Sequence, residues 1–366
     1  MTTPIEVNGA MGEGGGQVLR SALSLSLLTG QAFRLSRIRA NRDRPGLRPQ
    51  HLAAVQSAAR ISGARVSGDR VGSEEIAFEP GPVRPGEYFF DIGTAGATAL
   101  VLQTLLVPLA LTSGSSRITI RGGTHVPASP CYHYLDWQWR PFLLRVGVPF
   151  DLSLTMAGFY PEGGGELQAR IPGGAKPRPL QLIERGALHS VRGLSAVVNL
   201  PREIAERQRR QALRRLRTLL PDSEPAIVLE ELPAVSRGTV LLLLAELDCG
   251  QVCCFGLGAR GKRAERVADE AVDSLTAYLR GDGAVDPWLA DQLLLPLALA
   301  DGPSLLRTAA VTSHLLTNAE VIRLFLPVEI GVDGPLGASA TIHLRPAPSG
   351  AKAQARSTGD LCFART

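Results

Sequence analysis

The feature that most constrains the fold is a recurring order of apolar patterns. Segments with alternating apolar residues predict strands, and segments with apolar residues three and four apart predict helices. The first two predicted helices are each followed by a glycine, Gly30 and Gly63, which is a typical helix end. The first round, with the order βαβαββ, comprises residues 5–8, 16–28, 32–38, 47–61, 64–66 and 75–79.

The same order returns twice more along the chain. The second round comprises a strand, a helix, a strand, a helix and two strands at residues 88–92, 97–112, 117–121, 132–146, 149–154 and 165–171. The third round opens with a strand at 180–183 and resumes only much later. Its remaining helix, strand, helix and two strands are predicted at residues 289–299, 305–311, 318–325, 328–332 and 338–344.

An extra block at residues 188–279 interrupts the third round. It has predicted strands and helices of its own, at residues 191–199, 202–219, 226–231, 240–247, 252–255 and 262–279. Repeated units that cannot bury their apolar faces alone are expected to stack into one larger body.

The predicted fold class is therefore α/β (α+β), with three βαβαββ-type repeats in a large domain and a smaller α/β domain inserted. Residues 1–185 would hold the first two repeats and the start of the third, 186–281 the inserted domain, and 282–345 the rest of the third repeat. Residues 346–366 are rich in Pro, Ser, Gly, Ala and Arg and are predicted to be disordered.

Composition excludes several classes of protein. The N-terminus lacks the basic and apolar regions of a signal peptide, and the longest apolar stretches, 98–112 and 291–300, are too short to span a bilayer. The expectation is a soluble, cytoplasmic protein without a membrane partner. Five scattered cysteines without CxxC pairs argue against a disulfide framework or a zinc site and are interpreted as buried thiols.

The net charge is only +5, but the basic residues are almost all arginine, because lysine occurs only at positions 176, 262 and 352. Arginine suits bidentate contacts with phosphate. Six arginines gather at the end of a predicted strand and in the loop after it: Arg34, Arg37, Arg39, Arg42, Arg44 and Arg48. This cluster is typical of a surface for a polyanion, although a solvated loop would have the same composition.

A glycine-rich segment, residues 9–16, leads into the first helix. Glycines at a helix start let backbone N–H groups approach an anion, and the helix dipole favours phosphate. Glu13 adds an oxygen ligand suited to Mg²⁺ or Mn²⁺, and Arg20 lies one helical turn further on. A structural turn is an equally good interpretation of the glycines alone.

Two late segments carry further candidates. Asp286 followed by Pro287 predicts a helix cap, and Trp288, Asp291 and Gln292 could stack on or bond to a nucleotide. His314 falls in a predicted strand-to-helix loop, with Thr317 or Asn318 as the expected N-cap. A neutral imidazole there could attack phosphorus, although a lone histidine is more often structural.

One tempting motif is rejected. Residues 256–261 match GxGxxG after a strand, but no second strand with an acidic residue follows. The same glycines with Lys262 nearly match a P-loop, but Arg263 stands where Ser or Thr would bind Mg²⁺. A P-loop-like phosphotransferase is therefore a weak alternative, and a tight glycine turn is preferred. None of the three lysines has the K-x-D/N-G setting of ligase-type nucleotidyl transfer.

Taken together, these motifs resemble the RNA 3′-terminal phosphate cyclase family, in its catalytic, ATP-dependent branch. The resemblance runs from about residue 5 to 344 and is densest at residues 9–30, 39–50, 93–103, 158–165, 289–300 and 313–327. It implies three repeats with an inserted domain. It also implies a ligase that uses ATP to turn an RNA 3′-terminal phosphate into a 2′,3′-cyclic phosphodiester, releasing AMP and diphosphate.

The resemblance also implies roles for individual residues. His314 would be adenylylated and would pass AMP to the RNA 3′-phosphate, giving RNA(3′)pp(5′)A. Glu13 would lie near the triphosphate and the metal. The implied adenylate pocket comprises Gln103, Pro130, Tyr134, Trp288, Leu289, Ala290, Asp291 and Gln292, and the implied phosphate and RNA-end contacts are Arg20, Arg39, Arg42 and Gln50. Trp288 stands where many members carry tyrosine, and Tyr134 where phenylalanine is often seen.

A second class of function stays open at this point. The family also has ribosome-assembly relatives that bind RNA without catalysis, and the arginine cluster would serve them equally well. His314 at the nucleophile position favours the enzyme. The sequence does not settle the RNA substrate or the oligomeric state.

Overall fold

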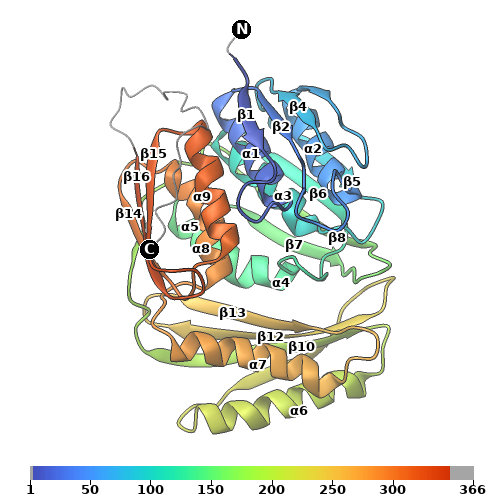
Figure 1. Ribbon diagram of the computed structural model, residues 1–366. Helices are drawn as coiled ribbons and strands as arrows, with labels where there is room; N and C mark the ends of the chain where they lie inside the picture. The colour runs from blue at the N-terminus through green and yellow to red at the C-terminus, as the bar shows by residue number, and fades with distance from the viewer. Residues whose placement is uncertain (1–2, 347–366) are drawn as a thin grey trace.

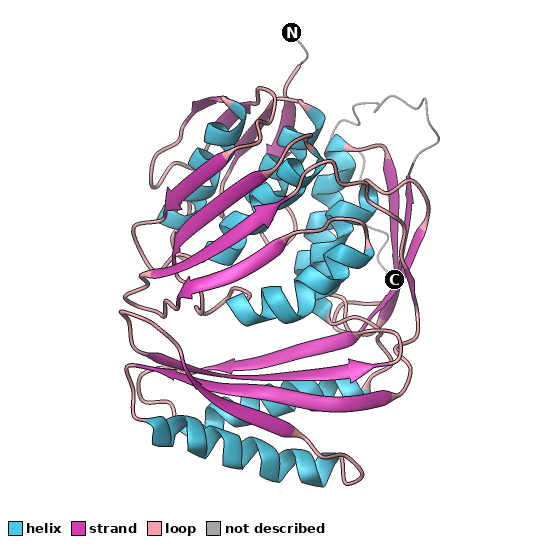
Figure 2. Ribbon diagram, turned by 180° about the vertical axis from the view of Figure 1, so that it is seen from behind, coloured by secondary structure: helices cyan, strands magenta, loops and turns pink. Residues whose placement is uncertain are grey.

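The computed structural model describes residues 3–346, and within them the strands form four mixed four-stranded sheets interleaved with helices (Figures 1 and 2). The predicted α/β class with an added smaller unit is confirmed. The predicted disordered tail lies outside the described residues, except for residue 346, which belongs to the last strand.

The first unit has the predicted order. Strand β1 pairs in parallel with β2, and β2 and β3 each pair antiparallel with β4, which gives the sheet order β1-β2-β4-β3. Gly30 and Gly63 end the two helices with φ of 69° and 65°, a left-handed conformation that glycine adopts without steric cost. The elements are β1 (Ile5–Asn8), α1 (Gln17–Thr29), β2 (Phe33–Ser36), α2 (Pro49–Ser62), β3 (Arg65–Ser67) and β4 (Ile76–Glu79).

The second unit repeats this connectivity with the order β5-β6-β8-β7. Its first helix, α3, continues through Pro108, which has no N–H to donate to the carbonyl of Thr104. The Ser24 hydroxyl of α1 donates to that carbonyl instead, at 2.8 Å. The elements are β5 (Glu87–Asp91), α3 (Thr98–Leu111), β6 (Ser116–Gly122), α4 (Tyr132–Tyr134), α5 (Arg140–Arg145), β7 (Asp151–Met156) and β8 (Gly165–Ile171).

The helix predicted at 132–146 is interrupted by a π-helical turn at Leu135–Trp139, between α4 and α5. Pro141 follows this turn and lacks the N–H that would reach the carbonyl of Trp137. The side chain of Gln251 donates to that carbonyl. Widened turns of this kind occur frequently at functional sites.

The third unit again has the same connectivity, in the order β15-β16-β14-β9. The prediction for its second helix was wrong at one end, because α9 begins at Ser313 and not at 318. The elements are β9 (Gln181–Leu182), α8 (Pro287–Ala298), β14 (Ser304–Thr308), α9 (Ser313–Phe325), β15 (Val328–Asp333) and β16 (Ala340–Pro346).

The helices of the three units pack against one another, α1 against α3 and α9, and α8 against α9, while the sheets lie on the outside (Figure 1). The apolar residues buried between them form one continuous cluster. Because these helices meet between the three sheets, the loops that precede α1, α8 and α9 lie close together. Within residues 3–346, no helix has both the length and the apolar composition to cross a membrane.

The block within the third unit forms the fourth sheet, in the order β11-β10-β12-β13. Helices α6 and α7 and one face of this sheet share an apolar cluster, and the opposite face packs against Tyr134 and Phe159 of the second unit. Cys253 and Cys254 are buried as expected, whereas Cys249 is exposed. The elements are β10 (Leu188–Val198), α6 (Arg202–Leu219), β11 (Ala226–Glu231), β12 (Gly238–Leu247), β13 (Gln251–Leu257) and α7 (Ala264–Arg280).

The domain boundaries at residues 186 and 281 stay a prediction.

Candidate functional site

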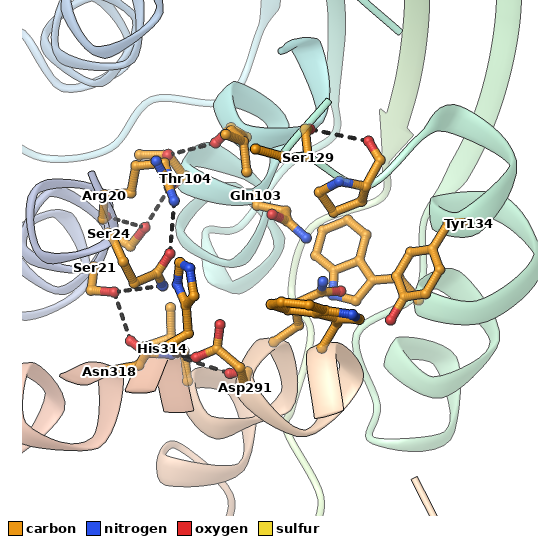
Figure 3. Close-up of a pocket in the computed structure, with 18 of the residues that line it drawn as sticks. Arg20, Ser21, Ser24, Gln103, Thr104, Ser129, Tyr134, Asp291, His314 and Asn318 are labelled. Carbon is orange, nitrogen blue, oxygen red and sulfur yellow. Dashed lines mark hydrogen bonds between the residues drawn. The ribbon is translucent and has the colours of Figure 1, made fainter. Parts of the chain in front are cut away.

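A cavity of about 390 Å³ lies where the helices of the three units meet (Figure 3). Side chains from α1, α3, α8 and α9 line it, and β13 of the fourth sheet adds Phe255 and Leu257. Eight residues singled out in the sequence lie in its wall: Arg20, Gln103, Pro130, Tyr134, Trp288, Asp291, Gln292 and His314.

His314 lies in the first turn of α9, and not in a loop before the helix. Thr312 is the N-cap, and its hydroxyl accepts the backbone N–H of Leu315 at 3.1 Å. The expectation that Thr317 or Asn318 caps this helix was wrong. The His314 side chain is 31% exposed, and its Nε2 lies 3.0 Å from Oε2 of Glu13. A histidine paired with a carboxylate at the rim of a cavity is oriented for chemistry on a ligand.

Glu13 is held in place by the helix that carries His314. The backbone N–H of Glu13 donates to Oγ1 of Thr317 at 3.1 Å. The approach requires glycine at position 12, where φ is +55° and a Cβ would lie 2.0 Å from Oγ1 of Thr317. The glycine-rich segment before α1 is thus joined to α9 at both His314 and Thr317.

The charge state of Glu13 depends on its neighbours. Burial acts to raise the pKa of Glu13, but the hydrogen bond and positive charge of His314, together with Arg42 and Arg20, outweigh it and leave the pKa below its usual value. Its second oxygen, Oε1, is buried without a hydrogen-bond partner. An ionised carboxylate with an unpaired oxygen is suited to a hard cation.

The site offers a magnesium or manganese ion a single carboxylate ligand, that of Glu13. The part of the chain described by the structure contains no group of three or more Asp, Glu, His or Cys side chains that could hold a metal. Mg²⁺ in nucleotide sites is commonly bound by one or two carboxylates with phosphate and water oxygens completing the shell. Glu13 is therefore the residue that would hold such an ion.

Arg20 points into the cavity from α1. Burial lowers the pKa of its guanidinium to about 10, with Asp291 and Glu13 opposing the shift, so Arg20 stays charged at neutral pH. Its Nη2 donates to Oε1 of Gln17 at 2.8 Å. His51 of α2 is buried beside it, and burial first, then Arg20, Arg39 and Arg48, lower the pKa of His51 to about 3. A neutral imidazole next to a charged guanidinium leaves Arg20 available for an anion.

Asp291 contributes a carboxyl group to the cavity wall. Burial raises its pKa to about 6, against the opposing effects of His314, Asn318 and Arg20. Asn318 donates Nδ2 to Oδ1 of Asp291 at 2.9 Å. Because Thr317 or Asn318 was expected to cap the helix, the place of Asn318 in the cavity wall was not predicted.

Two aromatic residues, Trp288 and Tyr134, also line the cavity. Trp288 is 55% exposed, and its ring lies 6.0 Å from the His314 ring in an edge-to-face arrangement, at 72°. Tyr134 is buried, and its hydroxyl donates to Asp286 at 3.1 Å. Asp286 also accepts the backbone N–H of Trp288 at 3.0 Å, so the predicted cap is present and fixes both aromatic residues. An exposed indole beside a cavity can stack on a planar ring.

Several polar atoms in the cavity wall have no partner. Within the described residues, five buried side-chain N or O atoms lack a hydrogen bond: Glu13 Oε1, Gln103 Nε2, Gln138 Oε1, Trp139 Nε1 and Gln292 Oε1. Gln103, Trp139 and Gln292 line the cavity. Buried polar groups are normally paired, so this cluster indicates a ligand that offers both donors and acceptors.

The remaining predicted residues lie outside the cavity wall. Arg42 reaches Glu13, with Nη2 3.3 Å from Oε2. Arg39 donates to the carbonyls of Arg44 and Gly46 at 2.6 and 3.0 Å, so it shapes its own loop. The Gln50 side chain accepts the backbone N–H of Ala97 at 3.3 Å.

Leu289 and Ala290 also differ from the expectation. Both side chains are fully buried in the apolar core, because they face inward from α8 while Trp288 and Gln292 face the cavity. They support the site as packing and do not line it.

Lys262 does not have the surroundings of a P-loop lysine. Its Nζ donates to the carbonyl of Leu257 and to Glu270, both at 2.7 Å. Gly256 lies where a Cβ would meet the Val267 carbonyl at 2.1 Å, so this glycine allows β13 and α7 to pack closely. The tight-turn interpretation of the motif accounts for these contacts.

The fold and the cavity define an α/β protein of three repeated units. Its central site combines a histidine–carboxylate pair, a half-buried arginine and unpaired groups suited to a phosphorylated ligand. The sequence profile of the RNA 3′-terminal phosphate cyclase family matches residues 11–332.

Individual relatives agree with this match. The chain is 43% identical to the RNA 3′-terminal phosphate cyclase of Methylococcus capsulatus, over 88% of this chain and 91% of that one. It is 47% identical to that of Pseudomonas fluorescens, over 89% and 93%, and 42% identical to that of Methanopyrus kandleri, over 93% and 99%. A solved enolpyruvyl transferase from Streptomyces tendae matches 46% of this chain and 33% of its own, with 18% identity and a TM-score of 0.28, which is too distant to carry an argument. The chain belongs to the RNA 3′-terminal phosphate cyclase family.

Proposed function

We propose that this chain converts an RNA 3′-terminal phosphate into a 2′,3′-cyclic phosphodiester at the expense of ATP. A ring nitrogen of His314 attacks the α-phosphorus of ATP, and diphosphate leaves. The AMP passes to the RNA 3′-phosphate, giving RNA(3′)pp(5′)A. The adjacent 2′-hydroxyl then attacks the 3′-phosphorus, the ring closes, and AMP leaves.

The position of His314 is the observation that carries this proposal. Its imidazole stands at the cavity rim, with Nε2 3.0 Å from the Glu13 carboxylate. A carboxylate beside an imidazole orients the ring and stabilises the charge that develops when the ring forms a bond to phosphorus. The pairing joins segments far apart in the sequence and is supported by Thr317, which suits a dedicated site better than a surface histidine.

The cavity supports ATP as the nucleotide. Trp288 can stack on a base, while Gln103 Nε2 and Gln292 Oε1 offer one unpaired donor and one unpaired acceptor, which match the ring nitrogen and amino group on the edge of adenine. Arg20 lies on the His314 side and would bind phosphate. A Mg²⁺ or Mn²⁺ ion held by Glu13 would offset negative charge on the triphosphate.

The arginine cluster supports RNA as the second substrate. Arg42 is half-exposed and reaches the Glu13 carboxylate from outside the cavity, so it would meet a phosphate that approaches His314 from solvent. Arg39 keeps the loop that carries Arg42 in shape. A cation at the rim can draw a terminal phosphate toward His314.

The decisive test is covalent labelling. Incubation with α-labelled ATP and Mg²⁺ or Mn²⁺ should give a protein label that is acid-labile and base-stable. His314→Asn should abolish both the label and the cyclic product, because asparagine has no nucleophilic ring nitrogen. Full labelling of His314→Asn would contradict a histidine intermediate.

The same assay addresses the non-catalytic alternative. A ribosome-assembly relative would bind RNA through the arginine cluster but would accept no label. Unlabelled wild-type protein that still binds RNA ends would favour that alternative.

A further inference from the structure

A continuous chain of hydrogen bonds crosses the cavity floor from Arg20 to Asp291 (Figure 3). Arg20 Nη2 donates to Gln17 Oε1 at 2.8 Å, and Gln17 Nε2 donates to the Ser21 hydroxyl at 3.1 Å. The Ser21 hydroxyl donates to Asn318 Oδ1 at 2.6 Å, and Asn318 Nδ2 donates to Asp291 Oδ1 at 2.9 Å. We call these five side chains the polar relay.

The direction of every bond in the polar relay follows from its two ends. A guanidinium only donates, so Gln17 must present its oxygen to Arg20 and its nitrogen to Ser21. A carboxylate only accepts, so Asn318 must present its nitrogen to Asp291 and its oxygen to Ser21. Gln17 and Asn318 each accept through the amide oxygen and donate through the amide nitrogen, whereas Ser21 accepts and donates through the same hydroxyl group. All four bonds therefore point the same way, and such chains strengthen one another.

The polar relay joins three helices at the point where they carry the site. Gln17, Arg20 and Ser21 share one face of α1, Asp291 belongs to α8, and Asn318 lies one turn after His314 in α9. Ser21, Asn318 and Asp291 are 7%, 5% and 8% exposed, so water cannot replace a lost partner easily. The polar relay thus links Arg20 to Asp291 through side-chain hydrogen bonds, in addition to the apolar packing of the three helices.

We propose that Gln17, Ser21 and Asn318 are positioning residues for adenylyl transfer. They hold the cation of Arg20 in register with Asp291 and with the turn of α9 that presents His314. This inference rests on the proposed function, because it assigns the phosphate to Arg20 and the attack to His314. Neither Gln17, Ser21 nor Asn318 needs to touch the substrate for this role.

The test is a double-mutant cycle between Ser21 and Asn318, read in single-turnover labelling at saturating ATP. Ser21→Ala and Asn318→Ala should each slow labelling about ten-fold, which corresponds to ~1.4 kcal/mol. Because both substitutions break the same series of hydrogen bonds, the double variant should label at a rate within about two-fold of that of the slower single variant. Ser21→Thr keeps the hydroxyl and should restore most of the rate.

A matched control separates positioning from loss of stability. Ser26 is a fully buried serine of the same helix whose hydroxyl donates to the carbonyl of Gln31 at 2.6 Å, away from the cavity. Ser26→Ala should lose stability yet keep the wild-type rate constant. Instability lowers only the labelled fraction, whereas misplacement of Arg20 lowers the rate constant. The same cycle read in urea unfolding should also show coupling between Ser21 and Asn318.

The outcomes distinguish the two proposals. If the wild type is labelled but the two single effects multiply in the double variant, the polar relay is overturned and the proposed function stands. The same conclusion follows if Ser21→Ala reduces only the labelled fraction and not the rate constant. Wild type without label overturns the proposed function and with it this role of the relay. Additive changes in the free energy of unfolding would show that Ser21 and Asn318 are not coupled, which would also overturn the polar relay.

Discussion

Asp291 is a single residue whose burial has consequences for the whole site. An ordinary aspartate is ionised well below neutral pH, but burial raises the pKa of Asp291 to about 6. The native state therefore holds this proton more tightly than the unfolded chain does. The neighbouring charges of His314 and Arg20 and the hydrogen bond from Asn318 compensate only in part. Buried carboxyl groups that cost stability are typical of sites selected for function.

This leads to a prediction for Asp291→Asn. Because the folded pKa is raised, the contribution of Asp291 to stability is fully present below its unfolded value and is lost as pH rises through about 6. Asparagine keeps the oxygen that accepts from Asn318 but cannot ionise. The variant should therefore gain on wild type above pH 6, by up to roughly 3 kcal/mol.

The measurement is urea unfolding of both proteins between pH 4.5 and 8. Titrating groups that do not interact with Asp291 cancel in the difference between the two free energies of unfolding. A difference that does not change with pH would show that Asp291 ionises normally.

At the scale of elements, the arginine-rich loop between β2 and α2 divides its work between two residues. Arg39 has φ of 56°, in the left-handed region, and its guanidinium bonds two carbonyls of the same loop. Arg42 lies in the same loop, four residues before Gly46, and its side chain points toward Glu13. One arginine holds the loop and the other faces the site.

Both Arg42→Ala and Arg39→Ala should impair use of RNA ends more than self-adenylylation. Arg42→Ala removes a charged contact, worth about 1.5–3 kcal/mol where it binds phosphate directly. Arg39→Ala should act through loop order, so it should also make the loop more sensitive to proteolysis, which Arg42→Ala should not. Labelling and cyclisation rates, with limited proteolysis, check this. Equal loss in both reactions would assign these arginines to the ATP phosphates.

The β13–α7 turn provides a prediction of no effect on chemistry. Lys262 is engaged by Glu270 and a carbonyl, outside the cavity wall. Lys262→Ala should leave the labelling rate near wild type and cost about 0.5–1 kcal/mol of stability, as expected for a partly exposed ion pair. Labelling kinetics and thermal melts measure both. A large loss of labelling would revive the P-loop alternative.

Element boundaries show where local sequence information ends. The sequence predicted the helix that carries His314 from residue 318, because Thr317 and Asn318 both look like N-caps. In the structure Thr312 is the cap, and Thr317 and Asn318 face sideways to Glu13 and Asp291. Ser, Thr and Asn can cap a helix or bond another element, and only distant partners decide which. The π-helical turn before Pro141 was not predicted for the same reason, because Gln251, which bonds it, comes from another sheet.

At the scale of the whole molecule, the repeated order predicted more than any single motif. The order βαβαββ predicted three sheets with one shared connectivity, and the motifs together with the family resemblance identified eight of the residues in the cavity wall. The contact of Glu13 with His314 could not be derived from spacing, because it depends on how α1 packs against α9. Phe255 and Leu257 were missed because they belong to β13 of the fourth sheet, and only the packing of that sheet against the second unit brings them to the cavity.

In the proposed function, ATP and the RNA end react in sequence at the same histidine of one cavity. Substrates that differ only at the terminal 2′ position should therefore stop at different stages. RNA with a 3′-phosphate and a 2′-hydroxyl should give the cyclic end. The same strand with a terminal 2′-methoxy group should still accept AMP, because the 3′-phosphate is the attacking group in that step. It should then accumulate as the adenylylated strand, since proximity has no nucleophile to act on.

Gel mobility and mass of the strand distinguish these products, and a strand ending in a 3′-hydroxyl serves as the unreactive control. His314→Asn should give no adenylylated strand from any of them, because the AMP reaches RNA only through the histidine. If the 2′-methoxy strand takes no AMP while the hydroxyl strand cyclises, the 2′-hydroxyl is needed for binding as well as for attack. A cyclic end formed from the 2′-methoxy strand is incompatible with attack by the 2′-hydroxyl.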